Sequence, residues 1–176
     1  DTEQAYIYFG SSFNADSKDE ENYKAKVASF ILGGSGFGSR LMEEIRVKRG
    51  LAYSAYGSIS INKSHTYFNG YLQTKNESAN EAKDLVKQLV AQFVKDGVTQ
   101  EELTAAKNFL TGSEPLRSET LSQRLNSAFT LYYRGLEQDY SKKEIKKIQN
   151  LKLEDLNSYI KSHNEINNLT FSIVRK

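Results

Sequence analysis

Apolar residues recur with two different periods along this chain, and the changes of period divide it into strands and helices. Residues 5–13 are rich in aromatic and β-branched side chains, which predicts a strand. After Ser17 the apolar positions fall at helical spacing, which predicts a helix with one buried stripe. The glycine-rich run 33–38 then ends that helix. The stripe consists of Tyr23, Val27, Phe30 and Ile31.

A short helix and a hairpin are expected next. The helix has Leu41, Met42 and Ile45 inward, and Gly50 follows its last turn. Strict alternation then predicts a strand over 51–61, and the returning strand 66–74 follows the turn 62–65. The alternation places Leu51, Tyr53, Ala55, Gly57, Ile59 and Ile61 on one face and Ala52, Ser54, Tyr56, Ser58 and Ser60 on the other.

The second half of the chain is expected to be mainly helical. The predicted elements are a helix over 78–96 that stops at Gly97, a helix that Thr99 and Glu102 open with a capping box, a helix from near Pro115 to Arg134, a helix that Ser141 and Glu144 open with a capping box, a helix over 153–162, and a closing strand over 169–174. In the helix that ends at Arg134, helical spacing relates Leu121, Leu125, Ala128, Phe129 and Tyr132. This order of elements indicates an α+β fold, with a mainly antiparallel sheet and helices packed on one face.

Composition narrows the possible classes of protein. The 176 residues fit a single domain, 1–176, with 38% apolar and 26% charged residues. A net charge of +2 gives no field directed at nucleic acid. The chain has no cysteine, which excludes disulfides and thiolate sites, and it has no apolar run long enough to cross a membrane.

The residues that most often carry catalysis are sparse. The two histidines, His65 and His163, stand far apart and in no HExxH or HxxEH pattern, so we expect no zinc site within this chain. The run 33–38 lacks the Gly-Lys-Ser/Thr ending of a P-loop, and a tight connection between helices explains its glycines better. No serine lies in a G-x-S-x-G pattern.

The segment 32–58 carries a more specific pattern. It contains a Leu-Gly-Gly loop, then Ser-Arg-Leu, an Arg-x-x-x-Gly helix ending and Leu-Ala-Tyr-Ser entering a strand. Together these pieces resemble the signature of the C-terminal, non-catalytic domain in the pitrilysin/insulinase family of zinc metallopeptidases. Phe37-Gly38 stands where relatives often have small polar residues, which affects the expected shape of the loop but not the resemblance.

The resemblance implies a role for two side chains. Arg46 and Tyr53 match an arginine and a tyrosine that, in this family, reach across a closed chamber to the substrate backbone. Zinc would then be held by the catalytic half, which is absent from this chain, and peptides or unfolded segments would be the substrates. Guanidinium and phenol are donors that can hold a peptide carbonyl without selecting a side chain. Arg40, Lys48 and Arg49 are explained by a solvated helix face.

Several expectations and alternatives follow from this reading. A chain that begins at Asp1, without a signal-peptide profile, is expected to be a fragment of a longer two-half peptidase. One alternative is a peptide-binding or scaffolding subunit of a catalytically inactive family member. Another is an unrelated interaction domain, in which Arg46 and Tyr53 would share no concave surface. The family resemblance favours a bacterial periplasm or cell envelope.

Overall fold

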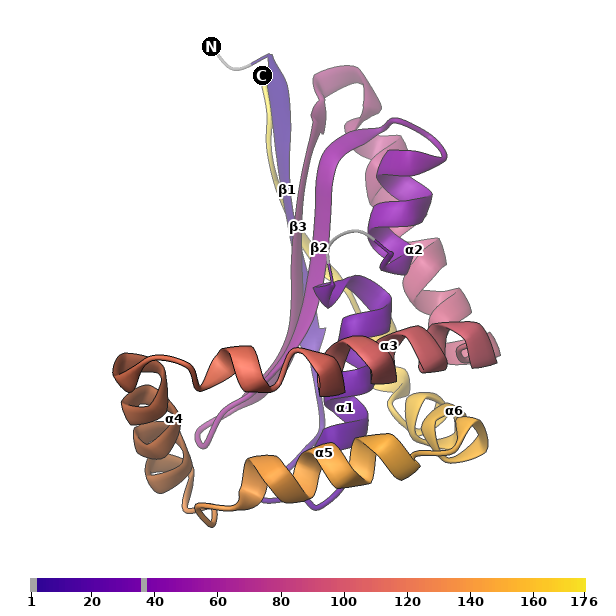
Figure 1. The fold of residues 1–176 in the computed structure, drawn as a ribbon. Coiled ribbons are helices and arrows are strands. Elements are labelled where there is room, and N and C mark those ends of the chain that lie inside the picture. Colours follow the sequence, from indigo (N-terminus) through magenta and orange to yellow (C-terminus); the bar gives the residue numbers. More distant parts are fainter. Residues whose placement is uncertain (1–2, 36–37) are drawn as a thin grey trace.

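One antiparallel sheet forms the frame of the molecule. The computed structural model describes residues 3–35 and 38–176, and within these residues the sheet has four strands in the order β2–β3–β1–β4. The strands are β1 (Gln4–Ser12), β2 (Ala52–Ile61), β3 (Thr66–Lys75) and β4 (Thr170–Val174). Helices α1 and α2 lie on one side of the sheet (Figure 1), which confirms the predicted α+β class.

The helices agree with most of the predicted ranges. They are α1 (Asn22–Ser29), α2 (Ala79–Asp96), α3 (Gln100–Gly112), α4 (Leu121–Arg134), α5 (Tyr140–Asn150) and α6 (Leu153–Ser162). Two wider, π-helical segments, η1 (Phe30–Gly34) and η2 (Met42–Val47), flank the glycine-rich loop. Single 3₁₀ turns occur at η3 (Asn76–Ser78), η4 (Pro115–Arg117) and η5 (Asn164–Asn167).

A single hydrophobic cluster joins the sheet to the helices. Ile7 of β1, Phe68 of β3 and Phe93 of α2 are almost fully buried in it, as are Ile148 of α5 and Leu156 of α6. Removing this apolar area from water supplies the main driving force for holding the two layers together. The helix-facing side of the sheet is therefore fixed, and its other side is left for solvent.

One of the two predicted capping boxes needs correction. The capping box of Thr99 and Glu102 is confirmed. The box predicted for Ser141 and Glu144 is wrong, because α5 already begins at Tyr140 with no side-chain cap. Glu144 instead pairs with Lys26 of α1 across the core edge.

The helix expected from Pro115 is divided in two. Pro115 opens the separate turn η4, and α4 begins only after Thr120. Thr120 and Gln123 form a capping box that satisfies the first amides of α4. This Thr-x-x-Gln pattern is the local signal in the sequence for the break between η4 and α4, and the predicted helix from Pro115 did not take it into account.

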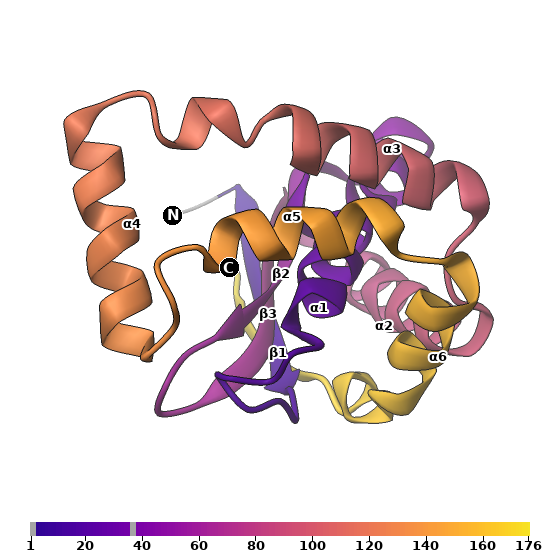
Figure 2. The same cartoon turned by 60° about the horizontal axis from the view of Figure 1, so that its bottom comes forward.

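Helix α4 stands apart from the sheet, between α3 and α5 (Figure 2). Its large apolar residues at helical spacing point outward rather than into the core, whereas Leu131 is the residue of α4 that is buried. The exposed ones are Leu121, Leu125, Phe129 and Tyr132. Periodicity identified the helix correctly but could not show that its stripe lies outside this chain's core.

Gly33 is required by a close approach of two elements. A Cβ on Gly33 would lie 2.5 Å from the amide nitrogen of Gly57 in β2. The sequence predicted that a tight connection between helices explains the glycines of 33–38. A backbone dihedral angle that favours glycine occurs at Gly38, with φ of 91°, whereas Gly33 is needed for space. Gly36 and Phe37 lie outside the described residues.

Replacing Gly33 by alanine tests this contact. Gly33→Ala is expected to lower the free energy of unfolding by about 1–3 kcal/mol, because the new methyl group must displace the backbone of β2. Gly112→Ala, at the end of α3, is the matched control: a Cβ there meets nothing within 4 Å. Urea unfolding of both variants would measure the difference, and equal stability of the two would contradict the account.

Candidate functional site

Arg46 is held near the end of η2 by the hydrogen bonds that reverse the chain. The amide of Gly50 donates to the carbonyl of Arg46 at 2.9 Å, and the amide of Leu51 donates to the carbonyl of Ile45 at 2.9 Å. Gly50 has φ of 60°, as expected for a glycine that follows a helical end. The segment therefore leaves η2 and enters β2 by a short, fixed path.

Tyr53 is directed outward by an irregularity in β2. Ala52 lies opposite Thr74 and Ala55 opposite Leu72, so β2 has one more residue than β3 across this interval. Such a bulge changes the face to which the following side chains point. Ala52 and Ala55 are both buried, whereas Tyr53 is 81% exposed.

This bulge overturns part of the predicted alternation. Tyr53 was expected to share a face with Ala55, and Ala52 was expected on the opposite face. In the structure Ala52 faces the core and Tyr53 does not. Strict alternation cannot continue through an inserted residue, and no residue in 51–55 marks the insertion clearly.

The structure brings the two predicted site residues together. The guanidinium carbon of Arg46 lies 4.8 Å from the centre of the Tyr53 ring, within the range of a cation–π contact. Both residues line one surface cavity of about 480 Å³, together with Gln4, Gln73 and Lys75. The alternative of an unrelated domain expected no shared concave surface, and this geometry contradicts that expectation.

A side chain from β3 anchors the start of β2 beside this cavity. The buried hydroxyl of Thr74 donates to the carbonyl of Leu51. A carbonyl next to a bulge would otherwise lack a ladder partner, so this bond compensates for the local irregularity. Thr74 thereby fixes the backbone from which Tyr53 projects.

The neighbouring basic residues have other tasks. Lys48 and Arg49 both pair with Glu44 on the surface, in agreement with a solvated helix face. Arg40 differs from that expectation: its Nε and Nη2 donate to the Glu102 carboxylate at 2.6 and 2.7 Å, and Nη2 also donates to the carbonyl of Gly97. Arg40 therefore joins the glycine-rich loop to the start of α3.

The ion pair of Arg40 makes stability depend on pH. Burial alone would raise the pKa of Glu102, but the hydrogen bonds from Arg40 and from the Thr99 amide lower it overall. A carboxylate with a depressed pKa stabilises the fold above its unfolded pKa, and that stabilisation is lost as the pH falls through the folded pKa.

Arg40→Met tests this linkage, with Arg49→Met as the exposed control. At pH 7, Arg40→Met is expected to lower the free energy of unfolding by about 2 kcal/mol. This difference in the free energy of unfolding should become smaller below pH 4.5, the ordinary pKa of a glutamate. Glu102 of the unmodified protein then becomes protonated and no longer pairs with Arg40 as an anion. Urea unfolding across this pH range measures it. A deficit that stays constant with pH, or an equal loss in Arg49→Met, would refute the role of the pair.

The histidines occupy structural positions. His163 ends α6, stacks on Phe13 with ring centres 4.2 Å apart, and bonds Glu165 through Nδ1 at 2.8 Å. His65 lies exposed in the turn between β2 and β3 beside Ser64. Within residues 3–35 and 38–176, no group of three or more His, Cys, Asp or Glu side chains could hold a metal ion.

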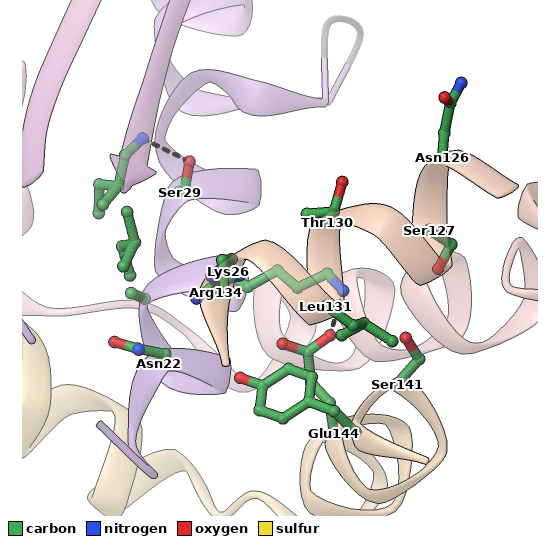
Figure 3. A pocket seen from close by; sticks show the side chains of 14 residues that line it. Asn22, Lys26, Ser29, Asn126, Ser127, Thr130, Leu131, Arg134, Ser141 and Glu144 are labelled. Atoms are coloured by element: carbon green, nitrogen blue, oxygen red, sulfur yellow. Dashed lines mark hydrogen bonds and ion pairs between the residues drawn. The ribbon is translucent and has the colours of Figure 1, made fainter. Parts of the chain in front are cut away.

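A second cavity lies between α1, α4 and α5 (Figure 3). It has a volume of about 480 Å³, and Lys26 and Glu144 pair inside it. Arg134, also in its lining, donates to the backbone carbonyl of Ser17 at 3.0 Å. Lys26, Arg134 and Glu144 in its lining therefore already interact with protein atoms, and these contacts connect α4 and α5 to α1 and the segment before it.

Comparison with known proteins supplies the remaining observations on this site. Residues 1–110 match the family described as the peptidase M16 inactive domain. A curated relative, the non-peptidase homolog YmxG of Helicobacter pylori, is 48% identical over 174 residues, which are 99% of this chain and 40% of that protein. The uncharacterized zinc protease YmxG of Bacillus subtilis is 29% identical over 126 residues, covering 72% of this chain and 30% of that protein.

Solved structures agree with this match. The peptidase M16 inactive domain from Pseudomonas fluorescens superposes with a TM-score of 0.88 and 27% identity, over 98% of this chain and 40% of that one. A protease from Helicobacter pylori shares the fold, with a TM-score of 0.87 and 18% identity, over 99% of this chain and 42% of that one. This chain thus spans less than half of each of these proteins. None of the helices in its described part is long and apolar enough to cross a membrane.

Proposed function

The chain belongs to the peptidase M16 family, as an inactive domain, and we propose that it is the substrate-gripping part of a longer zinc-dependent endopeptidase. Arg46 and Tyr53 would hold the backbone of a peptide or an unfolded segment. The zinc and the general base would come from a catalytic half, on the same chain or on a partner subunit. The match covers only 40% and 30% of two relatives, and the remaining length supports the presence of such a half.

The observation that carries this proposal is the outward Tyr53 beside Arg46. Tyr53 is 81% exposed and lies next to a guanidinium, at a bulge whose neighbouring alanines are buried. Its side chain therefore gives no benefit to packing. The arrangement presents hydrogen-bond donors around a shared cavity instead. Bulges often direct side chains toward binding sites in this way.

The chemistry of these two groups fits a site completed by zinc. A guanidinium and a phenol can both donate to a substrate carbonyl, which orients the peptide. A catalytic half that holds zinc would supply an activated water, and Arg46 and Tyr53 would donate to the carbonyl oxygen on which negative charge would develop.

A second candidate is a peptide-binding or scaffolding subunit without catalysis. The 48% identical relative from Helicobacter pylori is named a non-peptidase homolog, which favours this candidate. The more distant relative from Bacillus subtilis is named a zinc protease, which favours the first. Peptide gripping by Arg46 and Tyr53 is common to both. The presence or absence of His-x-x-Glu-His in the catalytic half of the full-length protein distinguishes them.

Compartment is part of the same proposal. We place the protein in the bacterial periplasm or cell envelope, on the strength of the family resemblance alone. Fractionation of cells that express the tagged full-length protein tests this placement, and recovery only with cytoplasmic markers would reject it.

Variants of the full-length protein test the role of the two residues. Arg46→Ala is expected to lower kcat/KM for a quenched peptide on the order of a hundredfold, and Tyr53→Phe about tenfold, since each loses a donor to the developing charge. Zinc content, measured by atomic absorption, should not change. Arg49→Ala is the control, because Arg49 pairs with Glu44 on the same surface.

Two outcomes would count against the proposal. Loss of zinc in Arg46→Ala would indicate a folding defect rather than a lost substrate contact. Zinc-dependent cleavage by the 176-residue chain alone would show that the chemistry does not need a second half. If the full-length protein cleaves nothing but still binds peptide through Arg46, the scaffolding candidate holds.

A further inference from the structure

The cavity that Arg46 and Tyr53 share has an uneven balance of charge. Of the described side chains that line it, those of Arg46 and Lys75 are positively charged, and none is negatively charged. The whole sequence is close to neutral, with 24 lysines and arginines against 22 aspartates and glutamates. The lining therefore differs from the chain as a whole, and its charge bears on which ligands the cavity accepts.

Strand pairing places Lys75 beside the proposed substrate contact. Lys75 is the last residue of β3, two positions after Gln73 and directly opposite Gln4 of β1. Residues opposite one another in an antiparallel pair, and residues two apart on one strand, lie on the same face of a sheet. Gln4 and Gln73 line the same cavity as Lys75. The cation thus stands next to two uncharged amides.

The ammonium group of Lys75 is only weakly neutralised by neighbouring carboxylates. It pairs with Glu77 at 4.0 Å, and the two side chains are 78% and 79% exposed. This distance is too long for a hydrogen bond, and solvent screens an exposed pair, so the contact contributes little. Neither Glu77 nor Glu3, the residue before Gln4, lines the cavity. The charge of Lys75 can therefore act on a bound ligand.

The amide groups beside Lys75 are held in a fixed orientation. Oε1 of Gln73 accepts from the Tyr71 hydroxyl at 3.1 Å, and Nε2 of Gln73 donates to Oε1 of Gln4. Burial raises the pKa of Tyr71, so the phenol keeps the proton that it donates. The NH₂ group of Gln4 is consequently directed away from Gln73, and an amide NH₂ group can donate to an anion. The surroundings of Lys75 thus add a donor to its positive charge.

We infer that Lys75 makes this cavity select peptides with an acidic side chain next to the backbone carbonyl that Arg46 and Tyr53 hold. The inference rests on the proposed function and adds a class of substrate. An aspartate or glutamate of the peptide would accept a charge-assisted hydrogen bond from Lys75, which is stronger than a bond between neutral groups. A lysine or arginine in that place would meet a like charge. The exposure of Lys75 keeps the preference moderate, because water screens the pair.

Fluorescence anisotropy with the full-length protein tests this preference. A chelator is present, so that a zinc-dependent catalytic half cannot cleave the probe. The probes are three fluorescein-labelled peptides of about ten residues, built from Gly, Ser and Asn, which differ only in a central Glu, Gln or Lys. The Glu peptide is expected to bind about three- to fivefold more tightly than the Gln peptide, and the Lys peptide more weakly than either. Raising the salt concentration from about 0.05 to 0.5 M should reduce these differences.

Reversing the charge of Lys75 locates the effect. In Lys75→Glu the order of affinities is expected to reverse, so that the Lys peptide binds most tightly. Lys63→Glu is the matched control, because it makes the same change of net charge at an exposed position in the turn at the other end of β3. It should leave the order unchanged. Thermal unfolding of each variant checks that a change in affinity does not come from a damaged fold.

Each outcome decides the matter. Reversal in Lys75→Glu, with Lys63→Glu unaffected, supports the inference. Equal affinity for the three peptides, an order that Lys75→Glu leaves unchanged, or the same change in both variants overturns it. Arg46→Ala separates the inference from the proposed function, since it should weaken all three peptides without changing their order. If it does so while the three peptides bind equally, the proposed grip stands and the inference fails. If no peptide binds, both fail.

Discussion

The inserted residue between Ala52 and Ala55 is the constraint from which the candidate site follows. With this insertion, β2 places the small side chains of Ala52 and Ala55 in the core, while Tyr53 points away from the core. Two alanines fit under the sheet where a tyrosine would not, so packing and the proposed substrate contact involve different residues of one strand. Thr74 supports the irregular backbone by donating to the carbonyl of Leu51. The turn at Gly50 sets the position of Arg46 relative to that strand. The position of the candidate site therefore follows from the way β2 packs in the core.

The two sides of the sheet have different surroundings. Helices α1 and α2 cover one side through a single hydrophobic cluster. Gly33 contributes to that packing, since its close approach to Gly57 places η1 directly against β2.

Sequence reasoning recovered the architecture, and it selected Arg46 and Tyr53, which the structure brings together. Both results depend on local patterns. Helical spacing, the Thr99–Glu102 capping box and the 32–58 motif are all visible without a structure. What it missed depends on contacts between distant segments. The bulge that directs Tyr53 outward depends on the pairing of β2 with β3, and Arg40 pairs with Glu102. The stripe on α4 is exposed because no other described part of this chain covers it.

The central claim is that Arg46 and Tyr53 hold the backbone of a peptide at their shared cavity. A ¹⁵N-labelled sample of this chain, titrated with an unstructured peptide and followed by amide chemical shifts, tests it most directly. The account predicts shifts at residues 46–53 that are lost in Arg46→Ala, with α6 unaffected. Shifts confined to the exposed stripe of α4, or to the cavity between α1, α4 and α5, would contradict it.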